Sequence, residues 1–136
     1  MDGDDEIVAE DLAMLHQFTF GDTAPMPNFS VGEWWLATCG DTPVGFAGMQ
    51  KSTVVPNAGY FSRVGVLKSH RGRNLQARFM QALERRARVH GWRCMISDTT
   101  ENPPSANCFI RMGWKTFDPK VRWSFPSAIY WRKFLD

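Results

Sequence analysis

The stretch that decides the fold is Val66-Leu67-Lys68-Ser69-His70-Arg71-Gly72-Arg73-Asn74-Leu75-Gln76-Ala77. It ends a β-rich run, Gly59–Leu67, and opens the strongest helical pattern in the chain, Asn74–His90. A strand that enters a glycine-containing turn and then a helix directs several backbone N–H groups to one point, where the helix dipole adds positive charge. Arg71 and Arg73 add full charges there. We therefore predict a phosphate-binding turn at His70–Ala77, with a strand–helix turn that binds nothing as the alternative.

Periodicity and turn residues predict the other elements of the chain. In order, they are a helix at Glu10–Phe18, a loop at Gly21–Ser30, strands at Glu33–Cys39 and Val44–Gln50 joined by a hairpin at Gly40–Pro43, a strand at Trp92–Asp98, a helix at Ser105–Met112, and strands at Trp114–Phe117 and Ala128–Phe134. This order predicts an α/β fold, a mixed, largely antiparallel sheet with helices on both faces. The strands on either side of the long helix should run parallel, through a right-handed crossover.

Length and composition predict a single domain over residues 1–136. The apolar fraction of 43% and the charged fraction of 22% are those of an ordinary globular protein. No apolar run approaches the roughly 20 residues that a membrane helix needs, and the acidic N-terminus is unlike a signal peptide. We therefore expect a cytoplasmic protein without a membrane partner. The three cysteines, Cys39, Cys94 and Cys108, fit neither a disulfide framework nor a metal motif, so we expect buried, reduced thiols and no metal.

Two motifs, in this order and spacing, resemble those of the GCN5-related N-acetyltransferase family. The segment Arg71–Gln76 is similar to the family's cofactor motif, Gln/Arg-x-x-Gly-x-Gly/Ala, and Asn102–Trp114 is similar to Asn-x-x-Ala/Ser-x-x-x-Tyr-x-x-x-Gly-Phe. The resemblance covers about residues 31–136 and implies acetyl-CoA as the co-substrate. The cofactor-binding residues that it implies are Val64, Val66, Leu67, Arg71, Gly72, Arg73, Asn74, Leu75, Gln76, Ala77, Asn102, Ser105 and Phe109.

The chain departs from the family pattern at three of these positions. Asn74 replaces a usual glycine and Gln76 a usual glycine or alanine; after glycine, asparagine is the residue that best tolerates unusual backbone angles. Phe109 stands where the family often has a tyrosine that protonates the leaving thiolate. Because the ordinary pKa of a thiol is about 8.5, a thiolate is a tolerable leaving group. We therefore expect the loss of the acid to slow transfer by roughly 10²-fold rather than to forbid it.

The resemblance also implies residues for the reacting centre. The family polarises the thioester carbonyl with a backbone N–H near a strand bulge, which by position is that of Val64, with Gly65 letting the strands splay. Tyr60 occupies the position of the glutamate base of histone-type members, and we expect it to line the acceptor site rather than to act as the base. The run 60–66 contains no carboxylate, so Asp98, at the end of the next strand, is the first candidate base. The further candidates are Glu33, Glu101 and His70.

The acceptor is expected to be a primary amine, on a small molecule first and on a protein N-terminus or lysine next. In this fold the region Gly21–Trp35 commonly lines the acceptor site, and it offers Phe20, Met26, Phe29, Trp34 and Trp35. Since side chains alternate along a strand, one of the two adjacent tryptophans should belong to the core instead. We expect direct attack of the amine in a ternary complex, in preference to an acyl intermediate on Cys108.

Two alternatives stand beside an acetyl-CoA-dependent N-acetyltransferase. One is a non-catalytic, acyl-CoA-binding regulatory module on the same fold, which Phe109 and the missing strand carboxylate favour. The other is a nucleic-acid-interacting protein that uses the arginine-rich face of the long helix. The sequence leaves open whether the chain is a monomer or a homodimer.

Overall fold

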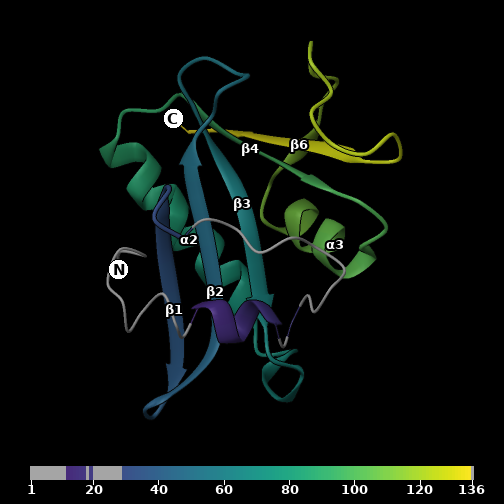
Figure 1. Cartoon of the computed structure of the whole chain (residues 1–136). Helices are drawn as coiled ribbons and strands as arrows, with labels where there is room; N and C mark the ends of the chain where they lie inside the picture. Colours follow the sequence, from purple (N-terminus) through teal and green to yellow (C-terminus); the bar gives the residue numbers. More distant parts are fainter. Residues whose placement is uncertain (1–11, 18, 20–28, 136) are drawn as a thin grey trace. The chain divides into compact units, whose positions relative to one another are not determined.

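The computed structural model describes residues 12–17, 19 and 29–135 (Figure 1). Six strands form one sheet in the order β1-β2-β3-β4-β6-β5. The elements are β1 (Glu33–Cys39), β2 (Thr42–Lys51), β3 (Ala58–Val66), the 3₁₀-helix η1 (Lys68–His70), α2 (Leu75–Val89), β4 (Cys94–Thr99), α3 (Pro103–Arg111), β5 (Lys115–Thr116) and β6 (Ile129–Phe134). A further helix precedes them, at residues 12–17 and 19. The predicted α/β class with a mixed, largely antiparallel sheet is confirmed.

The observed bounds differ from the predicted ones mainly at the first hairpin. Cys39 pairs with Thr42, so the turn consists of two residues, and β2 begins earlier than predicted. A register shift between Ala37 and Thr38 marks a β-bulge in β1. Within the described residues, no helix has the length and apolar character that crossing a membrane requires.

The chain divides into two compact units. The first comprises Met1–Gln50 and Ser62–Phe79, and the second comprises Lys51–Phe61 and Met80–Asp136. The prediction of one domain over residues 1–136 stays a prediction.

Within the first unit, helices cover both faces of β2. Phe46 belongs to a buried cluster with Leu12 and Leu15 of the first helix and with Trp34 of β1. The adjacent Gly45 faces the ring of Phe79 in α2, which would lie 3.3 Å from a Cβ atom at this position. Because neighbouring side chains of a strand point to opposite faces, the two helices lie on opposite sides of β2. The predicted placement of helices on both faces is thus confirmed here.

Within the second unit, β4 lies between a parallel and an antiparallel neighbour. The parallel register joins Ala58 to Cys94 and Tyr60 to Ile96, as the strand–helix–strand order predicts. The antiparallel register with β6 pairs Asp98 with Tyr130. One face of this unit carries aromatic packing around Phe109, and the other carries a cluster of Ala58, Cys94 and Ile96 packed against Val55, Tyr60, Phe117 and Trp123.

Two further observations concern a buried carboxylate in the second unit and the three cysteines. Glu84, on the apolar side of α2, is 4% exposed, and the Nζ atom of Lys133 lies 2.7 Å from its Oε1 atom. The cationic partner explains how a carboxylate can be buried in this position. Buried thiols were expected at all three cysteines, and this is wrong for Cys39, which is exposed because it ends β1 at the hairpin. Cys94 and Cys108 are buried.

A buried histidine in the first unit contacts an arginine of β3. His16 is 0% exposed, and Arg63 donates to its Nε2 atom at 2.9 Å. Burial, and secondly the charge of Arg63, lower the pKa of His16 below its ordinary value of 6.5. The native state therefore favours the neutral imidazole.

We expect this histidine to make the protein less stable in acid. A lowered native pKa leaves the full contribution to stability in place above about pH 6.5 and removes it as the pH falls through and below that value. In His16→Gln the side-chain oxygen can still accept from Arg63 but does not titrate. Urea unfolding at pH 7.5, 6.5 and 5.5 should show a smaller acid loss of free energy in the variant than in the native chain. Equal losses in the two proteins would contradict this role.

Candidate functional site

The turn between β3 and α2 contains two residues with left-handed backbone angles. Gly72 has φ +80°, and Asn74 has φ +62°. Nothing lies within 4 Å of the position that a Cβ atom would take on Gly72, so this glycine is required by its backbone angle and not by crowding. Asparagine is one of the few other residues that adopt such angles. Asn74 therefore adopts a backbone angle that glycine, the usual residue at this position of the motif, also allows.

The turn leads directly into α2, which begins at Leu75. The N–H of Arg78 donates to the carbonyl oxygen of Asn74 at 3.2 Å, which makes Asn74 the residue that caps the helix N-terminus. The N–H groups of Leu75 and Ala77 precede this bond and have no acceptor within the helix. Together with the helix dipole, such a terminus favours an anion.

The two arginines of the turn are both exposed. Arg71 folds back toward the end of β3, where its Nε atom donates to the carbonyl oxygen of Val66 at 3.2 Å. This bond holds a full positive charge beside the turn. The next residue, Leu67, is held against β2 by a hydrogen bond from its N–H to the carbonyl oxygen of Val44, at 2.9 Å.

The second motif opens α3 in the second unit. Asn102 caps this helix, and its Oδ1 atom accepts from the N–H of Ser105 at 3.2 Å. Ser105 is 8% exposed and Phe109 is 2% exposed. The Phe109 ring stacks on Trp131 at 5.5 Å and meets the Phe61 ring edge-on at 5.9 Å. Such burial leaves little of the ring for a ligand to touch, so the interpretation of Phe109 as packing agrees with its surroundings.

The two residues predicted at the acceptor side lie together in the second unit. The hydroxyl of Tyr60 donates to Oδ1 of Asp98 at 2.6 Å. A third residue, Trp123, donates from its Nε1 atom to the same oxygen at 2.9 Å. All three side chains are half-buried. Sequence reasoning missed Trp123, because it lies in an irregular segment where no periodicity signals which residues contact the sheet.

The other candidates for the reacting centre are dispersed along the chain. Val64 is half-buried in β3, and Glu33 is half-buried at the start of β1. Glu101 is exposed next to α3, and the Nδ1 atom of His70 lies 2.8 Å from the Ser69 hydroxyl.

Gly65 has a packing role that the sequence did not indicate. A Cβ atom at Gly65 would overlap with the Phe46 ring and would lie 2.6 Å from the Thr19 hydroxyl. Glycine is needed at this position because neighbouring side chains occupy the space of a Cβ atom. The splaying of the strands at Gly65 stays a prediction.

The described aromatic residues of the expected acceptor wall divide between the core and a half-buried position, and the wall itself stays a prediction. Trp34 is 3% exposed and Phe29 is 8% exposed, and their rings pack edge-on at 4.7 Å inside the core of the first unit. Trp35 is half-buried, in agreement with the alternation expected of adjacent strand residues. Phe20 and Met26 lie outside the described residues.

Cys108 is poorly suited to carry an acyl group. It is 2% exposed, and its Sγ atom lies 3.7 Å from Sδ of Met80. Burial raises the pKa of the Cys108 thiol, although the nearby Arg111 acts in the opposite direction. Because the thiolate is the nucleophile, a raised pKa disfavours an acyl-cysteine intermediate.

A strand–turn–helix with this anion-favouring terminus, followed by a capped second helix, can be compared with known families. Residues 8–114 match the model of the acetyltransferase (GNAT) family. The chain belongs to this family. The resemblance drawn from the two sequence motifs is therefore confirmed. No curated protein matches the sequence.

Several solved GNAT structures share this fold. The ribosomal-protein-S18-alanine N-acetyltransferase of Escherichia coli matches with a TM-score of 0.76 and 11% identity, over 96% of this chain and 90% of that chain. The IAA acetyltransferase of Bacillus cereus matches with a TM-score of 0.73 and 11% identity, over 90% and 91%. The PaiA N-acetyltransferase of Thermoplasma acidophilum, in complex with coenzyme A, matches with a TM-score of 0.63 and 14% identity, over 74% and 59%. At these identities, the likeness shows the fold alone.

We expect the left-handed angle at Asn74 to govern the start of α2. Asn74→Val places a β-branched side chain at φ +62° and should lower the free energy of unfolding by about 1–2 kcal/mol, whereas Asn74→Gly should preserve it. The matched control is Asn107→Val, at an exposed position inside α3, where asparagine and valine have similar helix propensities. Urea unfolding monitored by circular dichroism measures all three variants. Equal costs for the two valine substitutions would contradict the strain argument.

Proposed function

We propose that the chain transfers an acetyl group from acetyl-CoA to a primary amine, by direct attack of the amine in a ternary complex. The observation that carries the proposal is the turn from β3 to α2, in which Gly72 and Asn74 bring a helix N-terminus to the end of a strand. Membership of the acetyltransferase (GNAT) family supports the reaction class. The coenzyme A complex of the Thermoplasma relative supports the choice of acyl carrier.

The pyrophosphate of acetyl-CoA is assigned to the turn His70–Ala77. Backbone N–H groups of the first turn of α2 donate to the phosphate oxygens, and the exposed side chains of Arg71 and Arg73 neutralise their charge. The other residues that we assign to the cofactor site are Val64, Val66 and Leu67 along β3 and its end, and Asn102, Ser105 and Phe109 of the second motif. For Phe109, which is 2% exposed, the contribution is to shape and not to proton transfer.

Acyl transfer needs a polarised carbonyl, a deprotonated amine and a leaving thiolate. We assign the first task to the backbone N–H of Val64. The amine binds as an ammonium ion and first loses one proton to solvent, because only the neutral nitrogen has the lone pair that attacks the carbonyl carbon. As the C–N bond forms, the nitrogen becomes acidic again, and Oδ2 of Asp98 accepts its second proton. Tyr60 holds Asp98 through the hydrogen bond to Oδ1, at 2.6 Å. The C–S bond then breaks, and the thiolate of coenzyme A leaves and takes a proton from water. The ordinary thiol pKa of about 8.5 makes this departure possible without a tyrosine acid.

A second function, acyl-CoA binding without catalysis, is favoured by one observation. Phe109 has no hydroxyl group and is enclosed by Phe61, Trp114 and Trp131. Such a module would keep the anion-binding turn and release no thiol. Binding and transfer therefore have to be measured separately.

The binding experiment is calorimetry with acetyl-CoA. Arg71→Ala and Gly72→Pro should each weaken binding by about tenfold, since one removes a charge beside the phosphates and the other a backbone N–H and the left-handed angle. Arg88→Ala, an exposed arginine near the end of α2, is the matched control and should change binding less than twofold. Equal effects of Arg71→Ala and Arg88→Ala would count against the assigned pyrophosphate position. No binding at millimolar acetyl-CoA would remove both functions.

The transfer experiment measures thiol release over a panel of primary amines. Release that depends on an amine, and that falls at least tenfold in Asp98→Asn with unchanged acetyl-CoA binding, is the expected result. Binding without thiol release for any amine would instead favour the non-catalytic module.

A further inference from the structure

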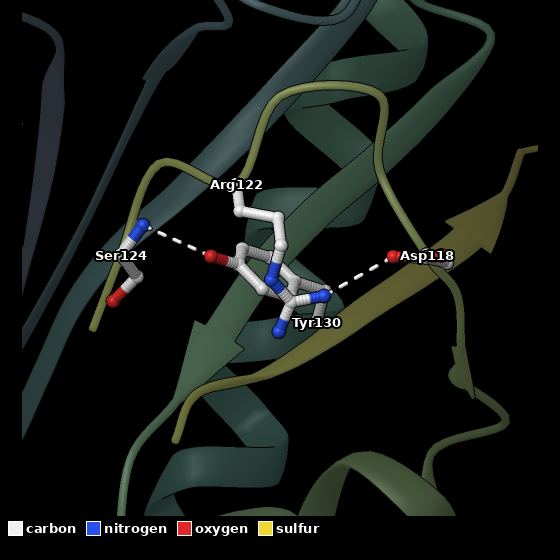
Figure 2. A network of polar contacts seen from close by, with 4 residues as sticks. All are labelled: Asp118, Arg122, Ser124 and Tyr130. Carbon is white, nitrogen blue, oxygen red and sulfur yellow. Dashed lines mark hydrogen bonds and ion pairs between the residues drawn. The ribbon is translucent and has the colours of Figure 1, made fainter. Parts of the chain in front are cut away.

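The connection between β5 and β6, residues 117–128, is fastened to its own sheet at several points. The N–H of Phe117 donates to the carbonyl oxygen of Tyr130 at 3.0 Å, and the N–H of Ser124 donates to the Tyr130 hydroxyl, also at 3.0 Å. Arg122 donates to Asp118 at 3.1 Å, and its guanidinium lies 4.9 Å from the centre of the Tyr130 ring (Figure 2). One strand residue, Tyr130, thus holds the connection from both its backbone and its side chain.

These bonds place the indole of Trp123 over the acceptor-side pair. Its ring meets the Tyr130 ring edge-on at 4.5 Å and the Tyr60 ring edge-on at 6.1 Å. Asp98 pairs with Tyr130 across β4 and β6, while Tyr60 pairs with Ile96, two residues before Asp98. Because residues two apart on a strand share a face, Tyr60, Asp98 and Tyr130 lie on one face of three neighbouring strands. Trp123 contacts all three.

The hydrogen bonds to Asp98 fix which of its oxygens is available. Trp123 and Tyr60 both donate to Oδ1, at 2.9 and 2.6 Å. Oδ2 receives no hydrogen bond from any residue in the part of the chain that the structure describes. An indole N–H is a donor only, so the bond from Trp123 cannot reverse its direction when the protonation state of Asp98 changes. The carboxylate of Asp98 is therefore held in place through Oδ1, and we take Oδ2 as the oxygen that is available to a ligand.

We propose that Trp123 is a positioning residue for the amine, which it serves by holding Asp98 and by offering its ring beside Oδ2. This inference rests on the proposed function and extends it to the class of acceptor. An ammonium group would bind Oδ2, and an apolar or aromatic body attached to it would pack on the edges of Trp123 and Tyr60. Amines with an aromatic or apolar body next to the ammonium are thus the favoured acceptors over small polar amines.

The first test observes the Trp123 indole directly, by ¹H–¹⁵N correlation spectra of the full chain. The Trp123 indole peak is identified by its absence in Trp123→Phe. It should shift in Asp98→Asn, and it should shift on addition of benzylamine but not of benzyl alcohol, which has the same ring without the ammonium. The Trp131 indole, which donates to the Thr99 hydroxyl at 2.9 Å, is the internal control and should stay in place. A Trp123 peak that does not respond to benzylamine would overturn the inference.

The second test separates the two substrates by kinetics. Trp123→Phe keeps an aromatic ring and loses the N–H, so kcat/KM for benzylamine should fall about tenfold, the size expected for losing one hydrogen bond to a charged group. The KM for acetyl-CoA should change less than twofold. The comparison variant, Trp131→Phe, loses an indole hydrogen bond of the same length one residue further along β4 and should lower the benzylamine kcat/KM by a smaller factor than Trp123→Phe does. Equal losses in the two variants would contradict a specific role for Trp123.

A third variant covers the case in which Trp123→Phe does not fold. Arg122→Met removes the exposed contacts with Asp118 and with the Tyr130 ring and leaves Trp123 and Asp98 unchanged. It should lower the benzylamine kcat/KM by a smaller factor than Trp123→Phe does, and no change would count against the proposal.

The spectra and the thiol-release assay together distinguish failure of the amine site from failure of the proposed transfer. If the Trp123 peak responds to benzylamine but no amine causes thiol release, the proposed transfer fails and the amine site stands. If an amine causes thiol release but the Trp123 peak does not shift, the amine site beside Trp123 fails and the proposed transfer stands.

Discussion

The chain leaves β3 at Val66 and begins α2 at Leu75, and two residues of this connection adopt left-handed backbone angles. These angles occur at Gly72 and Asn74, and the carbonyl oxygen of Asn74 accepts the first hydrogen bond of the helix. The resulting N-terminus lies beside the end of β3, where Arg71 is fastened to Val66. The start of α2 beside the end of β3 depends on this turn. The same geometry makes the turn attractive to an anion.

Much of this turn and of the fold could be predicted from the sequence. The helix Leu75–Val89 and the strand Ala58–Val66 lie within one residue of their predicted bounds, because their apolar patterns and the glycines around them are strong local signals. The departure from the motif at Asn74 also had a local explanation, since asparagine adopts left-handed angles.

The parts that could not be predicted depend on contacts between residues far apart in the sequence. Periodicity marks the apolar side of α2 but does not reveal that Lys133, in β6, lets Glu84 occupy that side. Tyr60 and Asp98 could each be named from a motif or a strand end, but their hydrogen bond follows from the parallel register of β3 and β4. No sequence pattern predicts the contact of Trp123 with Asp98, because this contact depends on an irregular connection that Tyr130 holds in place. Long-range pairing is set by the whole fold, and a local pattern does not encode it.

The proposed binding of acyl-CoA and the proposed binding of the amine are supported by different observations. The acyl-CoA part rests on a local motif, on backbone angles and on family membership. The amine part rests on three side chains from three separate segments, two of which donate to one oxygen of Asp98. In the proposed mechanism, Phe109 slows transfer because a buried phenylalanine has no proton to give to the leaving thiolate.

The proposed function depends above all on binding of the acetyl-CoA pyrophosphate by the helix N-terminus after Asn74. The most direct measurement is a titration of the ¹⁵N-labelled chain with coenzyme A, followed by the backbone amide peaks. The largest shifts are expected at the amides of Gly72, Leu75, Gln76 and Ala77, and dephospho-coenzyme A, which keeps the pyrophosphate, should produce them as well. Shifts concentrated instead on the exposed arginine side of α2, around Arg85 and Arg88, with the turn unmoved, would contradict this binding position.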